Sequence, residues 1–382
     1  MPSARHLARR LGGTARTSPA LLLVLLVVHL AWPDSNLMMG LSGRGAIDRE
    51  LGQAQTRGYY ETLIGSETRA RLATPDVRPE SDVEHPPPGW IPFADSGIVD
   101  EQPGYFRWRL KPSLDTSWNG QPFRTNSHGH RSPEVTLSKP PGTYRVVVLG
   151  SSNTMGHGVG DDDVYVRLFE TWLNQRLEGS GRRAEVVNMS VSGDSPSQGL
   201  WRLRHDVEAF QPDWIVSDAT VLDLSLEASH LETIVSRNVP IPLEYVRQAL
   251  ALAGATAADP PEVFRGKVRS VYRELLGGAY AGWAVESKRL GVPLSVLLIP
   301  RADKVTKNPE LIRLTHALCE KNGLDLIDLS DAFRGMSVET FRVALWDRHP
   351  SPAGHRAIFE AWRDATIQRR GCPGLVLPSP ED

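Results

Sequence analysis

The pattern of hydrophobic and polar positions changes at about residue 143. From there, short β-branched runs alternate with longer stretches whose apolar residues recur at helical spacing. The strand-like runs are Arg145–Leu149, Ala184–Asn188, Trp214–Ser217, Leu294–Ile299 and Leu324–Ile327. The helical runs are Tyr165–Leu177, Ser197–Phe210, Leu243–Ala253, Pro261–Leu290 and Pro309–Asn322, with a last helix from about Pro352. This alternation predicts an α/β fold, a flavodoxin-like three-layer sandwich of about five parallel strands covered on both faces by helices.

The remaining chain divides into segments of different composition. Residues 1–42 are predicted to be a cytoplasmic basic segment and a signal anchor, and 43–88 a polar, then Pro- and acid-rich, stalk or linker. Residues 89–142 contain short β-like pieces between turn signals, which predicts an irregular extension packed on the main domain. The main domain is placed at 143–370, with a helical insertion around 225–290 because that interval exceeds an ordinary crossover, and a tail at 371–382.

The N-terminal segment indicates export. Arginines precede an apolar run of roughly 13 residues, Ala20 to Trp32, which is typical of a signal peptide and short of the roughly 20 residues of a membrane span. No small-x-small cleavage site follows, so an uncleaved signal anchor is favoured over a removed peptide. The expected location is membrane-anchored and extracytoplasmic, periplasmic or at the cell surface, with the arginines cytoplasmic; a cleaved segment would make the protein secreted.

Charge and cysteine content exclude some classes. With 43 Lys and Arg against 45 Asp and Glu, the formal net charge is −2, and no basic stripe indicates nucleic-acid binding. Two cysteines, Cys319 and Cys372, are too few for a Cys-rich zinc module. In an oxidising compartment they could form a disulfide, and they could equally be two separate thiols.

Two distant stretches carry candidate chemistry. The run Arg145–Leu149 leads directly into Gly150-Ser151-Ser152, and a turn at the carboxyl end of a parallel strand is where open α/β sheets place their active sites. About 200 residues later Asp347 and His349 precede the last helix. A hydroxyl, a histidine base and a carboxylate that orients it are the parts of nucleophilic catalysis. Ser152 is the predicted nucleophile, His349 the base and Asp347 the orienting carboxylate.

Together these stretches resemble the SGNH hydrolases, also called GDSL-type esterases, over roughly residues 122–366. The first block of that family is matched by Gly150-Ser151-Ser152, the second by the run from Asn188 to Gln198 and the fifth by Asp347-Arg-His349-Pro. The lead-in from Phe123 to Arg131 is similar to that of many membrane-anchored members. The resemblance implies an SGNH fold without metal or organic cofactor, and an oxyanion hole built from the backbone N–H groups of Ser152 and Gly193.

The chain departs from the family pattern in three places. Ser151 stands where the first block usually has Asp, and Asp347 precedes His349 by two residues where three are more common. In the third block, which aligns with Thr220-Val-Leu-Asp223, Leu222 occupies the place of the oxyanion Asn. Losing one such donor typically costs about 100- to 1000-fold in turnover. Asn153, Thr220 and Ser192 are candidates to replace it.

Further residues have weaker signals. His157, near the nucleophile turn, and Arg301, after a strand, are candidate substrate-binding residues. The run Asp161–Asp163 is interpreted as the acidic start of a helix in preference to a cation site. The glycines around the turn lack a following Gly-Lys-Ser/Thr, which argues against a phosphate-binding loop.

The predicted function is a serine ester hydrolase that acts through an acyl-enzyme on a small O-acyl ester. Its expected partner is an acylated small molecule or glycan, including cell-envelope material. Two alternatives stay open: an O-acyltransferase with the same triad, and a catalytically impaired SGNH-like domain that only binds its ligand. A cytosolic nucleotide-binding protein of flavodoxin-like fold is disfavoured by the export signal.

Overall fold

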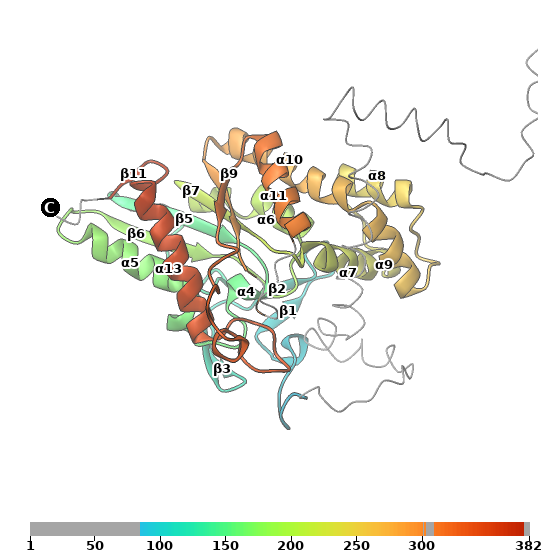
Figure 1. Ribbon diagram of the computed structural model, residues 1–382, viewed down its shortest axis with the longest axis horizontal. Helices are drawn as coiled ribbons and strands as arrows, with labels where there is room; N and C mark the ends of the chain where they lie inside the picture. Colours follow the sequence, from blue (N-terminus) through green and yellow to red (C-terminus); the bar gives the residue numbers. More distant parts are fainter. Residues whose placement is uncertain (1–84, 301, 303–308, 378–382) are drawn as a thin grey trace, which may run out of the picture. The chain divides into compact units, whose positions relative to one another are not determined.

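The computed structural model describes residues 85–300, 302 and 309–377. Its centre is a five-stranded parallel sheet in the order β6-β5-β7-β8-β9 (Figure 1). The strands are β5 (Thr143–Leu149), β6 (Arg183–Asn188), β7 (Trp214–Ala219), β8 (Leu294–Leu298) and β9 (Asp325–Asp328). Counted from β5, this is the 2-1-3-4-5 order of flavodoxin-like folds, which confirms the predicted fold class. The strand order reverses between β5 and β7, and in such sheets the carboxyl ends at that switch point form the crevice that binds ligands.

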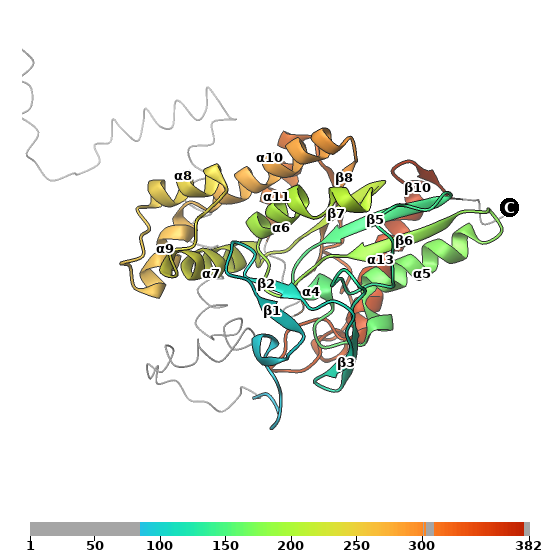
Figure 2. The ribbon, with the colours of Figure 1, turned by 180° about the vertical axis from the view of Figure 1, so that it is seen from behind.

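Helices cover both faces of the sheet, because its strands present apolar residues to both sides. On β5, Val147 and Leu149 face one core layer, while Val146 and Val148 face the other. The first layer packs against α6 (Pro196–His205), α10 (Tyr272–Leu290) and α11 (Pro309–Asn322), and the second against α5 (Tyr165–Leu177) and α13 (Pro352–Gln368) (Figures 1 and 2). The three-layer arrangement follows directly from this alternation.

Two helices predicted as continuous are interrupted in the structure. The run 197–210 ends as α6 at His205 and resumes as a short 3₁₀ helix, η4 (Glu208–Phe210). The run 261–290 divides at Val271 into α9 (Pro261–Ser270) and α10, because Val271 has a non-helical backbone. Together with α7 (Asp223–Ser236) and α8 (Glu244–Ala253), α9 and α10 make four helices between β7 and β8.

The segment that precedes the sheet forms two small antiparallel hairpins. Strand β1 (Val99–Glu101) pairs with β2 (Trp108–Leu110), and β3 (Asp115–Trp118) pairs with β4 (Gln121–Arg124). Their shared apolar core includes Phe93, Trp108, Trp118 and Phe123, together with Met155 from the short helix after β5 and Val191 from the loop after β6. The extension therefore packs on the carboxyl edge of the sheet.

Several predictions fall outside the described residues. The N-terminal segment 1–84 and Arg301 are among them, and the predicted domain boundaries stay predictions.

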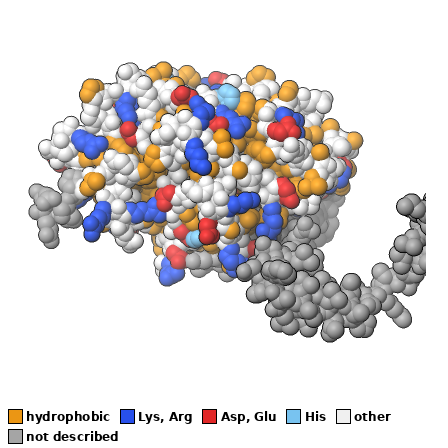
Figure 3. Space-filling view, turned by 90° about the horizontal axis from the view of Figure 1, so that it is seen from above, with side chains coloured by type: hydrophobic (Ala, Val, Ile, Leu, Met, Phe, Trp, Pro, Cys, Tyr) orange, Lys and Arg blue, Asp and Glu red, His pale blue; other side chains and the backbone are white. Residues whose placement is uncertain are grey.

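In the part of the chain that the structure describes, no helix is both long and apolar enough to cross a membrane. Cys319 and Cys372 are buried, separate thiols, so the disulfide alternative is wrong. On the face shown in Figure 3, acidic and basic side chains are interspersed.

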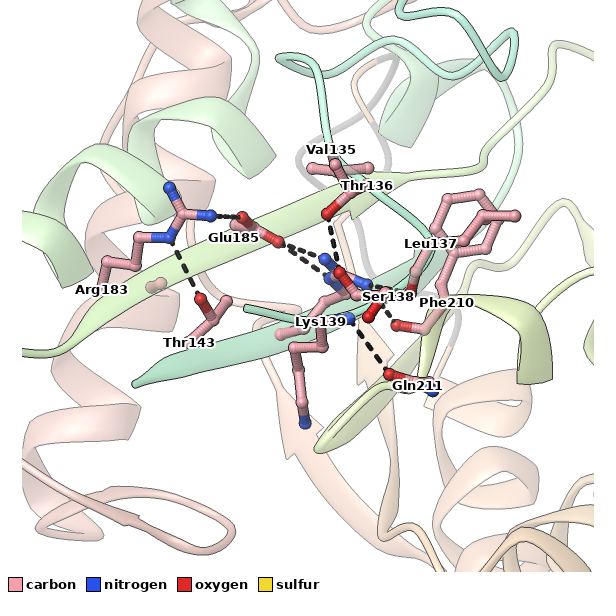
Figure 4. Close-up of polar contacts among 12 residues, drawn as sticks. Val135, Thr136, Leu137, Ser138, Lys139, Thr143, Arg183, Glu185, Phe210 and Gln211 are labelled. Atoms are coloured by element: carbon pink, nitrogen blue, oxygen red, sulfur yellow. Dashed lines mark hydrogen bonds and ion pairs between the residues drawn. The ribbon is translucent and has the colours of Figure 1, made fainter. Parts of the chain in front are cut away.

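A buried ion pair fixes the start of the central strand. The guanidinium of Arg145, on β5, bonds the carboxylate of Glu185, on β6, at 2.6 and 2.9 Å. The same guanidinium donates to the carbonyls of Leu137 and Phe210, while the second carboxylate oxygen binds Arg183 (Figure 4). Because Leu137 belongs to the segment entering β5, the pair ties the end of the extension to the sheet.

We predict that the two arginine partners of Glu185 differ in their effect on stability. Arg145→Gln should lower the free energy of unfolding by about 3–5 kcal/mol, since it leaves a buried carboxylate without its buried partner. Arg183→Gln should cost less than about 1 kcal/mol, because the Arg183 side chain is 55% exposed and that of Arg145 is 0% exposed. Urea unfolding of both variants measures the difference, and equal losses would contradict it.

Candidate active site

The turn after β5 is held from below by a carboxylate. Ser152 begins the short helix α4 (Ser152–Met155), and Asp218 Oδ2, at the end of β7, accepts the Ser151 N–H at 3.1 Å and the Thr154 hydroxyl. A Cβ at Gly150 would lie 2.3 Å from Asp218 Oδ2, so only glycine allows this approach. Burial raises the pKa of Asp218 to about 6, although its two hydrogen bonds oppose the shift.

The loop after α4 is held by an arginine from the extension. The side chain of Arg131 is 2% exposed and donates to the carbonyls of Met155 at 3.1 Å, Gly156 at 2.5 Å and Val159 at 2.8 Å. It also bonds Asp161 at 2.9 Å. The prediction that the acidic run starts a helix is confirmed, because the run forms a short 3₁₀ helix, η3 (Asp161–Asp163), immediately before α5. No side chain caps α5, and the Asp161 carboxylate balances the buried guanidinium.

Asp347 and His349 form a buried pair in the loop before α13. The ring Nδ1–H of His349 and its backbone N–H both donate to Asp347 Oδ1, at 2.6 and 3.1 Å. These two hydrogen bonds from one residue show how a carboxylate only two positions before the histidine can reach its imidazole. Burial alone would raise the pKa of Asp347, but the facing imidazoles and these hydrogen bonds hold it well below its usual range. With Nδ1 donating, neutral His349 presents Nε2 as the basic nitrogen.

His157 links this pair to the nucleophile turn. Its backbone N–H donates to the Ser152 carbonyl at 3.0 Å, and its ring stacks on His349 with centroids 4.0 Å apart and planes at 18°. Its Nε2 lies 3.6 Å from Asp347 Oδ2. Burial, followed by the charge of His349, lowers the pKa of His157 to about 3, so this ring is neutral at physiological pH. His157 thus contacts the backbone of Ser152 on one side and the Asp347–His349 pair on the other.

Ser152 and His349 are both buried residues, with 4% and 2% of their surface exposed, and the Ser152 hydroxyl does not hydrogen-bond His349 Nε2. Catalytic hydrogen bonds of ligand-free enzymes are often long and tighten only in the substrate complex. Because His157 contacts both the Ser152 backbone and the His349 ring, the two residues lie at the same carboxyl edge of the sheet.

The sequence-predicted oxyanion positions border the same edge. Gly193, with φ of +84°, lies in the turn after β6, and Leu222 precedes α7 as a buried apolar residue. The hydroxyl of Thr220 accepts the Leu222 N–H at 2.8 Å, and the Thr220 N–H donates to Asp223. Asn153 and Ser192 are both buried, and each is the sequence neighbour of a predicted N–H donor, Ser152 and Gly193. At the position where the family's third block has its Asn, the folded chain therefore has the buried apolar side chain of Leu222.

The two imidazoles and Asp347 also lie close enough to be considered as metal ligands, with donor atoms within 4.8 Å of one another. Imidazole lone pairs lie in the ring plane, and two rings stacked at 18° direct them along parallel planes that do not converge on one ion. The Nδ1–H of His349 already donates to the Asp347 carboxylate, so this nitrogen has no lone pair for a metal ion. The geometry suits an oriented base better than a metal centre.

Sequence reasoning missed Asp218 and Arg131 and undervalued His157. A charged residue inside the apolar run Trp214–Ala219 was a usable signal for Asp218. Nothing in the local sequence distinguishes Arg131 from the other arginines, because its partners are backbone carbonyls.

Comparison with known proteins identifies related sequences and structures. The model of the GDSL-like lipase/acylhydrolase family matches residues 148–357, more than half of the 382-residue chain. Similar solved structures include an acetylxylan esterase from Geobacillus stearothermophilus (19% identity, 58% of this chain and 93% of that one, TM-score 0.38). Others are the acetyl xylan esterase AlAXEase (18%, 58% and 100%, 0.39) and a GDSL-like lipase from Bacteroides thetaiotaomicron VPI-5482 (14%, 59% and 88%, 0.34). No protein in the search of curated proteins matches.

We predict that Asp218→Asn changes the pH dependence of stability. The folded pKa of about 6 exceeds the usual 3.8, so the folded state holds a proton that the unfolded state releases, and the free energy of unfolding falls as pH rises from 4 to 6. That loss amounts to about 3 kcal/mol and is absent in the amide, whose oxygen can still accept both hydrogen bonds. Urea unfolding at pH 4 and pH 7 should show the variant gaining on the native protein with pH; parallel profiles would contradict this.

We predict that His157→Ala lowers kcat for a small ester by about ten- to a hundredfold, because the base loses the ring that orients it. His157→Phe, which keeps a stacking ring, should retain more activity. His130→Ala removes another buried histidine, which packs on Phe210 away from the pair, and controls for lost stability. The measurement is kcat and its pH profile with folding checked by thermal unfolding, and an unchanged kcat in His157→Ala would refute the positioning role.

Proposed function

Because the chain belongs to the GDSL-like lipase/acylhydrolase family and is an ester-bond hydrolase, we propose that Ser152, His349 and Asp347 cleave a small O-acyl ester through an acyl-enzyme. The observation that carries this assignment is the buried 2.6 Å hydrogen bond between Asp347 and His349, packed against the turn of Ser152. It supplies an oriented base that His157 connects to the turn of Ser152, at the switch point of the sheet.

The reaction uses one proton carrier. His349 Nε2 takes the proton of the Ser152 hydroxyl while Oγ attacks the ester carbonyl carbon. Asp347, ionised because its pKa is low, stabilises the imidazolium that forms. When the tetrahedral intermediate collapses, the carbon–oxygen bond to the alcohol breaks and the imidazolium protonates the leaving oxygen. Water then repeats the sequence on the acyl-serine and releases the carboxylic acid.

The negative oxygen of the intermediate needs donors. We assign the backbone N–H groups of Ser152 and Gly193 to this role, and Asn153, next to the nucleophile, as the side-chain donor in place of Leu222. One missing donor lowers turnover by about 100- to 1000-fold. The rate of this hydrolase therefore depends on the side-chain donor that we assign to Asn153.

We infer an acylated glycan or other cell-envelope material as the substrate, and an extracytoplasmic, membrane-anchored location. The basic and apolar N-terminal segment supports the location. An O-acyltransferase would form the same acyl-enzyme and pass the acyl group to a sugar hydroxyl, so a search for acylated acceptor sugars belongs to the same assay.

A second candidate function is a catalytically impaired domain that binds an acylated ligand. Leu222 in the third block favours it, because the usual donor is absent. A fluorophosphonate probe distinguishes the two functions, since labelling requires a serine activated by its base.

We predict that Ser152→Ala lowers hydrolysis of p-nitrophenyl acetate by at least about a thousandfold and abolishes fluorophosphonate labelling. Ser151→Ala is the matched control, because Ser151 is held through its backbone, whose N–H donates to Asp218 and whose carbonyl accepts from the Met155 N–H, and the neighbouring hydroxyl is retained. It should keep most of the activity. Equal rates for native protein and Ser152→Ala would end the hydrolase assignment to this serine.

A further inference from the structure

A cavity lies beside the Asp347–His349 pair, mainly within the extension. Its volume is about 380 Å³, which is in the range of small-ligand sites. Four stretches of chain line it: the turn 87–90 that ends at Trp90, the tip of the β3–β4 hairpin at Trp118–Gln121, His157 with Gly158, and the loop that carries Trp346 and Asp347. We propose that this cavity binds a neutral sugar unit of the glycan, next to the unit that carries the acyl group.

The aromatic walls are suited to a sugar ring. Trp90 and Trp346 are half-buried and meet edge to face, with centroids 5.4 Å apart and planes at 78°. Trp118 is fixed by a hydrogen bond from its Nε1 to the Ile91 carbonyl at 2.9 Å and packs on His157 at 4.5 Å. Pyranose rings have C–H faces that pack on indole rings, and hydroxyl edges that need polar partners. The exposed amide of Gln121 supplies such a partner at the mouth of the cavity.

The charge of the lining selects a neutral ligand. None of the described residues that line the cavity is Lys or Arg, so a phosphate or uronate would find no cation there. The one carboxylate, Asp347, is engaged by His349. His157 is neutral and does not attract an anion.

The position of the cavity identifies which sugar unit it holds. His157 forms part of its lining and stacks on His349 at 4.0 Å, so one imidazole separates the cavity from the proposed base. A ligand there lies beside the reacting ester and cannot itself be the acylated unit. An oligosaccharide that runs from the nucleophile into the cavity would place its neighbouring unit between the tryptophans. This inference rests on the proposed function for its connection to catalysis, but the binding itself does not depend on hydrolysis.

The first experiment measures binding in Ser152→Ala, which cannot turn over substrate. Calorimetry or tryptophan fluorescence is carried out with xylotetraose, cellotetraose and chitotetraose, and with tetragalacturonate as the anionic comparison. We expect at least one neutral tetrasaccharide to bind and tetragalacturonate to bind more weakly. In a Ser152→Ala protein that also carries Trp90→Ala, the Kd for the neutral ligand should rise about tenfold or more. Trp172→Ala, a half-buried tryptophan on α5, is the matched control.

Trp90→Phe keeps an aromatic wall and should lose less affinity than Trp90→Ala, and thermal unfolding of each variant checks that the extension stays folded. If Trp90→Ala unfolds, Gln121→Ala at the exposed mouth serves as the second variant. The inference is overturned if no neutral tetrasaccharide binds, if binding ignores both substitutions, or if tetragalacturonate binds more tightly.

The second experiment connects the cavity to catalysis. For an otherwise native enzyme with Trp90→Ala, kcat/KM for acetylated xylotetraose should fall at least about tenfold further than kcat/KM for p-nitrophenyl acetate, mainly through KM. Equal falls for the two esters would overturn the subsite. If neither ester is hydrolysed by the native enzyme, the proposed function fails, while the binding experiment still decides the sugar site.

Discussion

The nucleophile turn depends on one buried cation that comes from outside the sheet. Arg131 donates to the carbonyls of α4 and the loop after it (Met155, Gly156 and Val159), to the Pro122 carbonyl and to the Asp161 carboxylate, so its five N–H groups have five acceptors. Removing one partner of a buried ion pair leaves the other charge uncompensated, so substitution of either Arg131 or Asp161 would be strongly destabilising. A Cβ at Gly156 would lie 2.9 Å from Arg131 Nη1, so the loop closes on the arginine only through glycine. The extension is therefore a structural part of the active site.

Two buried carboxylates near the turn have opposite environments and opposite roles. Asp218 faces only neutral donors, Ser151 N–H and the Thr154 hydroxyl, and its pKa is raised. Asp347 faces two imidazoles, and its pKa is lowered. A carboxylate that stays ionised can stabilise an imidazolium, whereas one close to neutrality is suited to hold a backbone turn. The environments separate the orienting acid from the positioning acid without any difference in residue type.

Periodicity predicted the sheet because its strands are short and four of the five, β5 to β8, are buried on both faces. It could not predict the break at Val271, where the apolar spacing continues through a backbone that leaves the helix. The Asp347–His349 pair could be predicted because both residues lie in one short stretch. His157 could not, because its role arises from a ring stacked across the fold. Arg145 shows the same limit: a strand residue of obvious charge is fully buried, since its partner Glu185 stands opposite it in the register.

The extension joins chemistry to recognition through one continuous apolar core. Phe93, Trp118 and Phe123 pack with Met155 of the nucleophile helix and Val191 of the loop that leads to Gly193. Close-packed side chains transmit displacement, because small gaps already forfeit contact energy. A displacement of Trp118 would therefore reach the core that supports the turn of Ser152 and the loop of Gly193. The extension both lines the cavity and supports the turn of Ser152, so these two parts of the site share one packed core. Selectivity for the alcohol portion of the ester can then change through the extension while the sheet, Asp218 and the Asp347–His349 pair stay the same.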